Sequence, residues 1–419
     1  MDSKERVILH IDVNNAFLAF EAAFRLQHGA TVDLRKIPSA VAGAQATRHG
    51  IILAKSLPAK QCGVKTGEAI WEAKQKCPNI AIIHPDYALY MCCHNALMEL
   101  LKNFTDRMQI FSIDECFLDI TNMKLLGDPL KTANEIKEKI KKELGFTVSI
   151  GISSNKLLAK IGSDMKKPDA ITTLYPSELP EKMWPLPVED LYMVGNATAP
   201  KLHKMGIFTI GDLARCDIEW LKYKFKSWGI LLWNYANGIE DSIVSGSGHS
   251  IIKGMGNSTT IHFDVEDKET AYLVLLSLVE TVGMRLRYGG FCCRVVSVTI
   301  KKAEDLTSYS HQRKLAVPVD CTNAIFEECK KLFDRMWKGE PIRHLGVRVS
   351  DLTASDSIQL SFLEKNWEKQ KKVDAVIDRI RMKYGPGSIV RSGFLRSGLA
   401  PLQGGLSEDV SFPVMTSIL

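Results

Sequence analysis

The chain has 419 residues, of which 45% are hydrophobic and 24% are charged, and its formal net charge is +6. One hydrophobic core rarely serves so long a chain, so we expect about two to four domains. The mild positive charge permits a polyanionic partner without demanding one, and no apolar run is long enough to span a membrane. Ten cysteines without metal-finger spacing, behind an N-terminus that lacks an export signal, predict a reducing, cytoplasmic location.

Residues up to about 175 alternate predicted strands and helices. Residues 7–13 form an apolar run typical of a buried strand, and residues 86–105 favour a helix. Residues 108–121 are typical of a β-hairpin, residues 129–145 carry apolar side chains at helical spacing, and a strand at 146–153 leads into a helix at 154–167. Three β segments with helices on one face predict an α+β, ferredoxin-like arrangement, with the insert at 16–77 as a separate lobe.

The rest of the chain changes character more than once. Residues 176–240 favour helices only. Residues 241–355, which begin with a linker rich in Gly and Ser, alternate strands with two helices in a β-α-β-β-α-β pattern. Residues 356–419 hold one helical piece and a polar, Gly-containing end that we expect to be flexible.

Two adjacent acids, Asp114 and Glu115, interrupt the strand-like run FSIDECFLDI. Neighbouring side chains of a strand point to opposite faces, so one of them should be buried, and a buried carboxylate is costly unless it is paired or binds a metal. Asp12 lies near the end of the first strand. If these strands are neighbours, three carboxylates converge and suit Mg²⁺, and two such ions about 3.5–4 Å apart could assist phosphoryl transfer. Alternatively, each acid only caps a strand end.

Three lysines, Lys156, Lys160 and Lys167, follow the strand at 146–153 at helical spacing. On a helix they would lie along one face, where they could balance the charge of a metal-bound polyphosphate. Lys60, in the inserted lobe, is a further candidate. The alternative is an ordinary solvated helix face.

Six motifs, taken in chain order, carry a family resemblance. They are HIDVNNAFLAFEA, AKSLPAKQCGVKTGEAI, SIDECFLDIT, GISSNKLLAKIGSDMKKP, VGNATAPKLHKMGI and GNSTT. In this order and with this spacing they resemble the Y-family DNA polymerases, the translesion class that includes the bacterial DinB and UmuC groups. The resemblance runs from Val7 to about Asp351, and the SLPAK variant favours the UmuC group.

This resemblance implies a multidomain right-hand polymerase. A ferredoxin-like palm would comprise residues 1–15 and 78–175, with fingers at 16–77, a helical thumb at 176–240, a β-α-β-β-α-β little finger at 241–355, and a clamp-binding, flexible tail at 356–419. The implied activity is template-dependent, error-prone primer extension past damaged template by two-metal nucleotidyl transfer. Primer-template DNA, a dNTP and two Mg²⁺ ions would bind, and the enzyme would act as a monomer.

The resemblance also implies roles for single residues near the acids. Asp114 and Glu115 would be catalytic, and both would bind metal together with Asp12 and the backbone carbonyl of Val13. The remaining residues implied to contact the nucleotide, through its sugar or its triphosphate, are Phe17, Lys60 and Lys167.

Two positions depart from the family pattern. Leu57 and Lys60 stand where a Tyr and an Arg are typical, so the charge is kept but the forked hydrogen bonding of arginine is lost. In the thumb hairpin, Met193 replaces a Gly, whereas Gly195 is kept and would contact a DNA phosphate through its backbone. Basic residues on strand-like segments of the little finger should also bind DNA: Arg294, Lys301, Lys302, Arg313 and Lys314.

A short peptide near the C-terminus, IQLSFL at 358–363, resembles the segment by which bacterial polymerases dock on the sliding clamp. Gln359 would form hydrogen bonds, and Leu360, Phe362 and Leu363 would fill an apolar pocket. The alternative is that this segment packs on its own domain.

Two other functions remain open at this point. A nucleotide cyclase-like enzyme also carries two metal-binding acids on a ferredoxin-like sheet, but it does not explain the helical hairpin or the second β domain. A non-catalytic DNA-binding subunit could keep the fold, although Asp12, Asp114 and Glu115 are all present. Measurements of DNA binding and primer extension would separate these alternatives.

Overall fold

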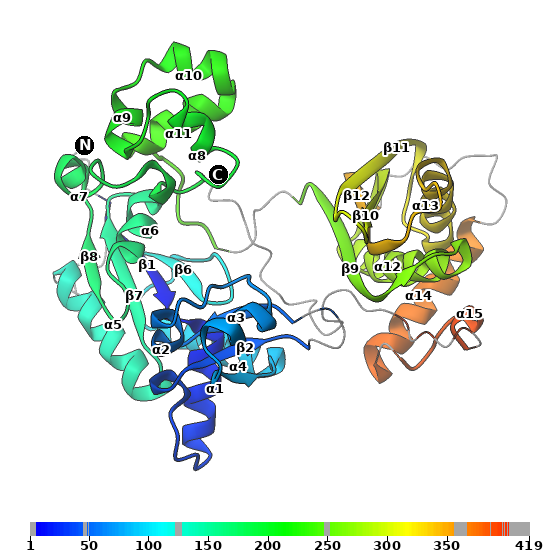
Figure 1. Cartoon of the computed structure of the whole chain (residues 1–419), viewed down its shortest axis with the longest axis horizontal. Coiled ribbons are helices and arrows are strands. Elements are labelled where there is room, and N and C mark those ends of the chain that lie inside the picture. The colour runs from blue at the N-terminus through cyan, green and yellow to red at the C-terminus, as the bar shows by residue number, and fades with distance from the viewer. Residues whose placement is uncertain are drawn as a thin grey trace. The chain divides into compact units, whose positions relative to one another are not determined.

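The structure is a computed structural model that describes residues 6–44, 48, 50–121, 128–246, 252–355, 367–385, 387–395, 397, 399 and 401. The chain divides into two compact units (Figure 1). Unit 1 comprises the chain up to Gly43 and from Ile51 to Ser250, and most of unit 2 follows from Ile251 onwards. Each unit has its own hydrophobic core. None of the helices in these described ranges is long and apolar enough to cross a membrane.

A five-stranded sheet with the order β5-β6-β1-β7-β8 forms the centre of unit 1. The strands are β1 (Ile8–Val13), β5 (Met108–Ile110), β6 (Glu115–Asp119), β7 (Val148–Ser153) and β8 (Ile171–Thr173). The middle strand β1 pairs antiparallel with both β6 and β7, and all of its residues are buried. Burial on both faces explains the unbroken apolar run in the sequence, and the sheet confirms the predicted α+β class.

Helices α4 (Tyr87–Lys102), α5 (Pro129–Leu144) and α6 (Lys156–Met165) belong to the same unit. Helix α6 lies directly on the sheet, because a Cβ atom at Gly151 of β7 would come within 1.8 Å of the carbonyl oxygen of Ala159. The side chain of Asn155 accepts the backbone N–H of Leu158 and so begins α6 beside the end of β7. This close approach holds the lysines of α6 against the sheet.

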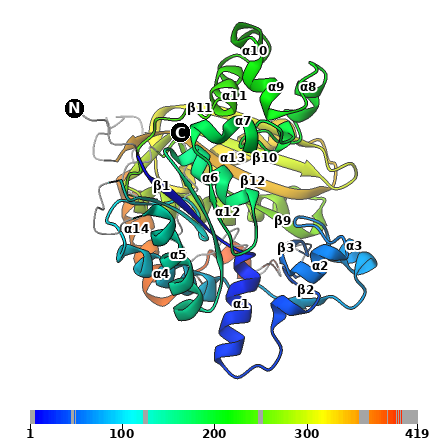
Figure 2. The same cartoon turned by 90° about the vertical axis from the view of Figure 1, so that its left-hand side faces the viewer.

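Helix α1 (Ala16–Gln27) follows β1 after a two-residue turn, as Figure 2 shows for the dark blue strand and helix. A small sheet of β2 (Ser39–Ala42), β3 (Ile52–Lys55) and β4 (Ala81–Ile83) comes next, with α2 (Leu57–Gln61) and α3 (Ile70–Lys76). Because β4 pairs with β2, the inserted lobe extends beyond the expected boundary at residue 77.

Residues 176–240 are helical, as the sequence predicts. This segment contains α7 (Leu179–Lys182), α8 (Ala199–His203), α9 (Ile210–Arg215), α10 (Ile218–Phe225) and α11 (Ser227–Ala236), together with short 3-10 turns at Pro176–Glu178 and Val188–Asp190. Lys226 alone joins α10 to α11, and it adopts φ 57° and ψ −135°. A side chain rarely occupies this region of backbone conformation, so the junction is strained.

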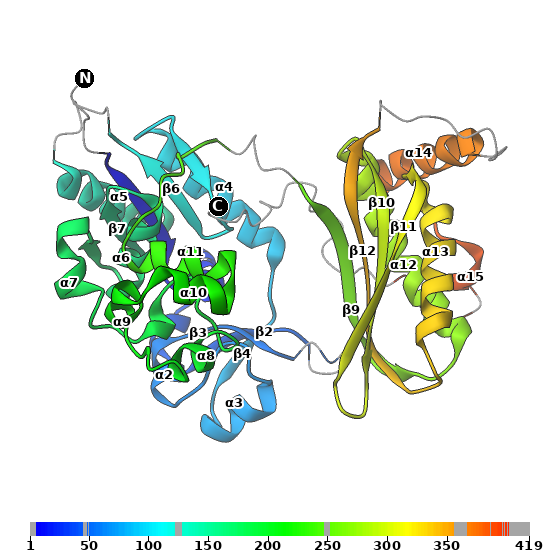
Figure 3. The ribbon, with the colours of Figure 1, turned by 90° about the horizontal axis from the view of Figure 1, so that it is seen from above.

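Unit 2 is built on a four-stranded antiparallel sheet with the order β11-β10-β12-β9. The strands are β9 (Gly254–Val265), β10 (Phe291–Lys302), β11 (Ser308–Val319) and β12 (Ile342–Ala354). Helices α12 (Lys268–Tyr288) and α13 (Thr322–Met336) cover one face of this sheet, as Figure 3 shows. The element order is the β-α-β-β-α-β pattern predicted from the sequence.

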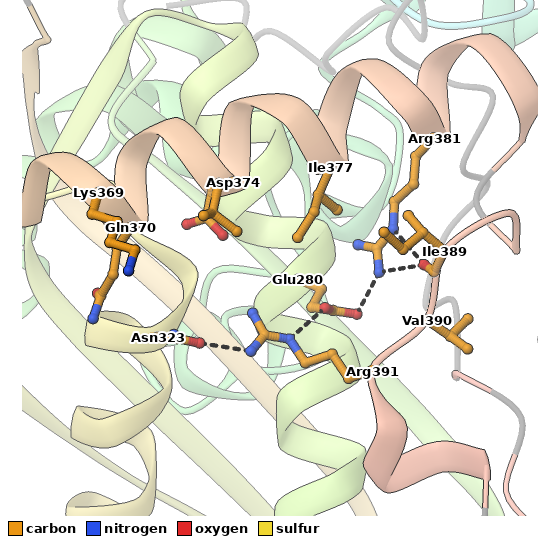
Figure 4. Close-up of a pocket in the computed structure, with 11 residues that line it drawn as sticks. Glu280, Asn323, Lys369, Gln370, Asp374, Ile377, Arg381, Ile389, Val390 and Arg391 are labelled. Carbon is orange, nitrogen blue, oxygen red and sulfur yellow. Dashed lines mark hydrogen bonds and ion pairs between the residues drawn. The ribbon is translucent and has the colours of Figure 1, made fainter.

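Two further helices, α14 (Trp367–Tyr384) and α15 (Ser392–Leu395), complete unit 2. Charged side chains attach α14 to the domain: Arg287 of α12 donates to Asp378 at 2.6 and 2.9 Å. Glu280 of α12 accepts from Arg381 at 3.1 Å and from Arg391 at 2.8 Å (Figure 4). Glu280 and its two arginine partners line a cavity of about 430 Å³. The helical piece expected in the last residues is therefore a docked helix.

Candidate active site

The pairing of β1 with β6 brings the three predicted acids together at one end of the sheet. Asp12 of β1 lies opposite Glu115 of β6 in the antiparallel register. The backbone N–H of Val13 donates to the carbonyl oxygen of Asp114 at 3.0 Å, which fixes the turn before β6. Acids that are about a hundred residues apart in the sequence thus become neighbours.

Burial and repulsion by neighbouring carboxylates disfavour the charged forms of Asp12 and Asp114. Burial raises the pKa of Asp12 to about 7, the nearby Lys167 opposes this shift, and Glu115 adds to it. Burial likewise raises the pKa of Asp114, a hydrogen bond from the Ser112 hydroxyl opposes the shift, and the charge of Asp12 adds to it. The site therefore needs positive charge if all of its carboxylates are to ionise.

Two of the three lysines expected near the acids contact them. Lys160 of α6 donates to Glu115 Oε1 at 2.7 Å, and Lys167, just after α6, lies 2.9 Å from Asp12 Oδ2. Lys156 does not reach the acids: its amine donates to the side chain of Gln109 and to the carbonyl of Ile243, both at 3.2 Å. Helical spacing alone could not distinguish this lysine from the other two.

The oxygen atoms of the three acids and of the Val13 carbonyl are ligands of the type that suits a hard divalent cation. Carboxylate oxygens and a backbone carbonyl are the ligands that Mg²⁺ prefers. Within the part of the chain that the structure describes, however, no group of three or more His, Cys, Asp or Glu residues is arranged to hold a metal ion. Lysine amines already contact Asp12 and Glu115. The acids are thus neighbours, but their carboxylates do not surround a single position that a metal ion could occupy.

Phe17 is the second residue of α1, a few residues after Asp12, and its side chain is partly exposed. Its ring stacks on Tyr90 of α4, with 4.7 Å between the ring centroids and 15° between the planes. The Tyr90 hydroxyl donates to Glu21 at 3.1 Å, and Arg25 donates to the other oxygen of Glu21 at 3.3 Å. Sequence reasoning missed this support, although Glu21 is the one acid within the apolar stretch of α1.

Lys60 and Leu57 lie on α2 in the inserted lobe, and both side chains are exposed. Ser56 caps this helix by accepting the backbone N–H of Ala59 at 3.2 Å. Burial and the charge of Lys60 lower the pKa of Lys55, which donates to Thr66 at 2.9 Å. Lys60 therefore belongs to a small basic region of the lobe.

In the helical segment, Gly195 is exposed in the turn before α8, where a Cβ atom would meet no other atom within 4 Å. Its carbonyl accepts the backbone N–H of Ala199 at 3.0 Å. Met193 has φ 76°, the left-handed conformation that a glycine adopts most readily. Met193 therefore holds a backbone conformation that a Gly at this position would adopt without strain.

The five basic residues expected to bind DNA do not lie on one face of the unit 2 sheet. Arg313 pairs with the buried Val296 across the strands, and it bonds to Glu328 of the covering helix α13 at 3.1 Å. Lys301 and Lys314 lie on the open face, where Lys314 contacts Asp351 at 3.2 Å. Two others make local contacts: Arg294 donates to the carbonyl of Ala316, and the Lys302 amine lies over the Tyr309 ring.

Arg348 of β12 is an open-face residue that sequence reasoning missed. It is exposed between the buried Val347 and Val349, and it pairs with Ser297 across the strands. The alternation in GVRVS was the signal that could have found it. The predicted clamp-binding residues Gln359, Leu360, Phe362 and Leu363 lie outside the described residues.

Family models match most of the chain. The model described as the impB/mucB/samB family matches residues 11–164, its C-terminal domain matches residues 252–362, and the HHH motif of the same family matches residues 176–207. The first match covers most of the site sheet with its inserted lobe, the second covers the sheet of unit 2, and the third covers part of the helical segment.

Curated relatives resemble the chain over nearly its full length. DNA polymerase IV of Clostridium acetobutylicum is 46% identical over 391 residues, which cover 93% of this chain and 98% of the relative. DNA polymerase IV 2 of Bacillus subtilis is 36% identical over 400 residues, 94% of this chain and 95% of the relative. These relatives do not carry a UmuC name, so they give no support to the UmuC group.

A solved structure shares the fold. The Y-family DNA polymerase chimera Dbh-Dpo4(243-245)-Dbh matches with a TM-score of 0.69 and 22% sequence identity. The match covers 83% of this chain and 99% of that chain. At this identity the likeness concerns the fold.

Proposed function

The chain belongs to the impB/mucB/samB family, the Y-family DNA polymerases, and on that premise we propose that it is a template-dependent, error-prone DNA polymerase that extends primers past damaged template. The observation that supports this best is the register pair of Asp12 and Glu115, with Asp114 beside it, at one end of a buried sheet. A test is primer extension by the purified protein across defined template lesions. Failure to extend even an undamaged template would contradict the proposal.

In the proposed reaction, the primer 3′-hydroxyl attacks the α-phosphate of a dNTP, and pyrophosphate leaves. Asp12, Asp114, Glu115 and the carbonyl of Val13 would hold two Mg²⁺ ions. These ions, when bound, would offset the negative charge of the phosphates and of the attacking oxygen. Lys160 would hold the Glu115 carboxylate in place through its 2.7 Å ion pair.

Residues from α1, from α2 and from the segment after α6 would orient the nucleotide. Phe17 would lie under the sugar, and its stacking on Tyr90 limits the positions that its ring can take. Lys167 and Lys60 would contact the triphosphate, and lysine supplies charge there without the paired hydrogen bonds of arginine. Leu57 cannot donate a hydrogen bond, so we expect weaker nucleotide binding than a Tyr at that position would give.

Primer-template DNA would be held mainly through its phosphates. The open face of the unit 2 sheet carries Lys301, Lys314 and Arg348 among small polar side chains, and Gly195 lies in an exposed turn. Such contacts position a duplex without reading its sequence. Among the two alternatives, a nucleotide cyclase-like enzyme would not need this second domain, and a non-catalytic subunit would not need the acids.

We also propose that the segment with Gln359, Leu360, Phe362 and Leu363 docks on the sliding clamp. The support is its sequence pattern alone. A synthetic peptide of residues 357–365 should bind the clamp, and replacing Gln359, Leu360 and Phe362 by Ala should remove stimulation by the clamp without changing intrinsic extension. Full stimulation of that triple variant would contradict the proposal. The monomeric state stays a prediction that sedimentation can test.

A further inference from the structure

Two lysines neutralise the acids of the active site, and their surroundings differ. The side chain of Lys160 is 10% exposed, and its amine lies 4.9 Å from the centre of the Phe111 ring as well as 2.7 Å from Glu115. The side chain of Lys167 is 35% exposed. Its amine is shared between Asp12 at 2.9 Å and Asp164 at 2.8 Å.

These surroundings determine how easily each ion pair can open. Separating a buried ion pair leaves an unpaired charge in a medium of low dielectric, which is strongly unfavourable. A lysine that reaches solvent loses less when its pair opens, because water replaces the contact on the lysine side, although a buried carboxylate left behind still needs another cation. Lys160 is thus a fixed counter-ion, whereas Lys167 can leave Asp12 and still keep both water and the half-exposed Asp164 as partners.

Asp12 cannot be left without a counter-charge. Its side chain is 8% exposed, and Glu115 lies opposite it across the strands. The Lys167 amine occupies one oxygen of this carboxylate, and a divalent cation that binds there must displace the amine. Lysine and cation therefore compete for Asp12.

We propose that Lys167 is a transferable counter-ion, which holds Asp12 in the nucleotide-free protein and releases it to a divalent cation when its own ammonium passes to the phosphates of the nucleotide. The inference rests on the proposed function, since it assumes that Asp12 is a metal ligand. Its consequence is coupling: Lys167 weakens metal binding in the absence of nucleotide, and it ceases to do so once phosphates are present. By linkage, the metal then strengthens nucleotide binding by the same factor.

Direct binding of Mn²⁺ to the full-length protein, without DNA or nucleotide, tests this inference without reference to activity. Electron paramagnetic resonance of free Mn²⁺ gives the affinity. Lys167→Met should bind Mn²⁺ about tenfold more tightly than the wild type, because a unit positive charge beside the ligand is gone. Lys167→Arg keeps that charge and should behave as the wild type. Lys222→Met is the matched control, since Lys222 forms an exposed pair with Glu219 within α10 of the helical segment.

The possible outcomes distinguish a failure of the counter-ion role from a failure of the metal site. The counter-ion role is overturned if the wild type and Lys167→Met bind Mn²⁺ equally tightly and Asp12→Asn abolishes Mn²⁺ binding in both backgrounds. That result leaves the metal site standing. Mn²⁺ binding that Asp12→Asn does not weaken counts against the metal site, and so against the proposed function as well as this inference.

A second measurement uses the wild-type protein and does not depend on the folding of a variant. An amine-acylating reagent should modify Lys167 faster when Mn²⁺ is added, because the ammonium loses its contact with Asp12. Mass spectrometry would compare Lys167 with the exposed Lys222 in the same sample. A Lys167 modification rate that does not rise with Mn²⁺, at concentrations that saturate the site, overturns the proposal.

Discussion

Phe17 and Tyr90 stack nearly face to face, with 4.7 Å between ring centroids and 15° between ring planes, although they come from different helices. Tyr90 is itself held by the buried Glu21, which accepts a hydrogen bond from the Tyr90 hydroxyl at an oxygen–oxygen distance of 3.1 Å. The position of the Phe17 ring is therefore set by a tyrosine and a carboxylate, as well as by its own rotamer.

Phe17→Ala should admit ribonucleotides, because the ring that would lie against the 2′ position of the sugar is removed. The ratio of dNTP to rNTP incorporation should fall by about tenfold or more, as expected for the loss of a few kcal/mol of steric discrimination. Tyr90→Leu should lower the ratio less, since it removes the stack but leaves the Phe17 ring. An unchanged ratio in folded Phe17→Ala protein would assign Phe17 to packing alone.

Asp114→Ala should abolish primer extension while leaving DNA binding nearly intact. Asp114 contacts Ser112 and is not paired with Lys160 or Lys167, so its removal leaves no lysine unpaired. The rate should fall on the order of a thousandfold, as for the loss of a group that stabilises transition-state charge. Single-turnover extension and DNA binding by fluorescence anisotropy would measure the two effects, with the exposed Glu135→Gln as a control. Near wild-type extension by Asp114→Ala would refute the two-metal mechanism.

DNA affinity should fall linearly with salt on a double-logarithmic plot, because phosphate contacts release counter-ions. Arg348→Ala should lower the slope by about one, since Arg348 is exposed on the open face of the sheet. Arg313→Ala should leave the slope unchanged, because Arg313 bonds to Glu328 on the helix-covered face. The opposite result for this matched pair would show that DNA lies on the other face.

Lys226→Gly should stabilise the helical segment at 176–240. At φ 57° and ψ −135°, the lysine backbone is strained by about 1–3 kcal/mol, whereas glycine adopts this conformation freely and loses about 0.5–1 kcal/mol in unfolded-state entropy. We expect a net gain of about 1 kcal/mol in the free energy of unfolding. Lys224→Gly, inside α10, should instead lose about 1 kcal/mol. Differential scanning calorimetry would compare the two, and a lower melting temperature for Lys226→Gly would contradict the strain.

Much of the fold could be predicted from local patterns. The apolar run of β1 indicated a strand buried on both faces, and the positions of Asp12, Asp114 and Glu115 at strand ends predicted a shared site once the strands were assumed to be neighbours. Periodicity carries such information because burial follows it.

Side-chain partners could not be predicted in the same way. A bulge between Cys293 and Val295 shifts the register of β10 against β11, so counting along the strand could not place Arg313 on the helix-covered face. The contact between Lys167 and Asp12 depends on the close approach of α6 to the sheet at Gly151, which no local pattern reveals. The support of Phe17 by Tyr90 and Glu21 is likewise a product of tertiary packing.

The ion pairs between α12 and α14 bear on where unit 2 can be truncated. Glu280 and Arg287 are 8% and 11% exposed, and their partners Arg381, Arg391, Asp374 and Asp378 all come from α14 or from the residues after it. A fragment that stops at the end of β12 would lose all of these ion pairs and would expose to water the part of α12 that α14 covers. The boundary suggested by the strand pattern therefore cuts through contacts that hold unit 2 together. Chimeras and truncations of this protein should carry α14 together with the helix that it covers.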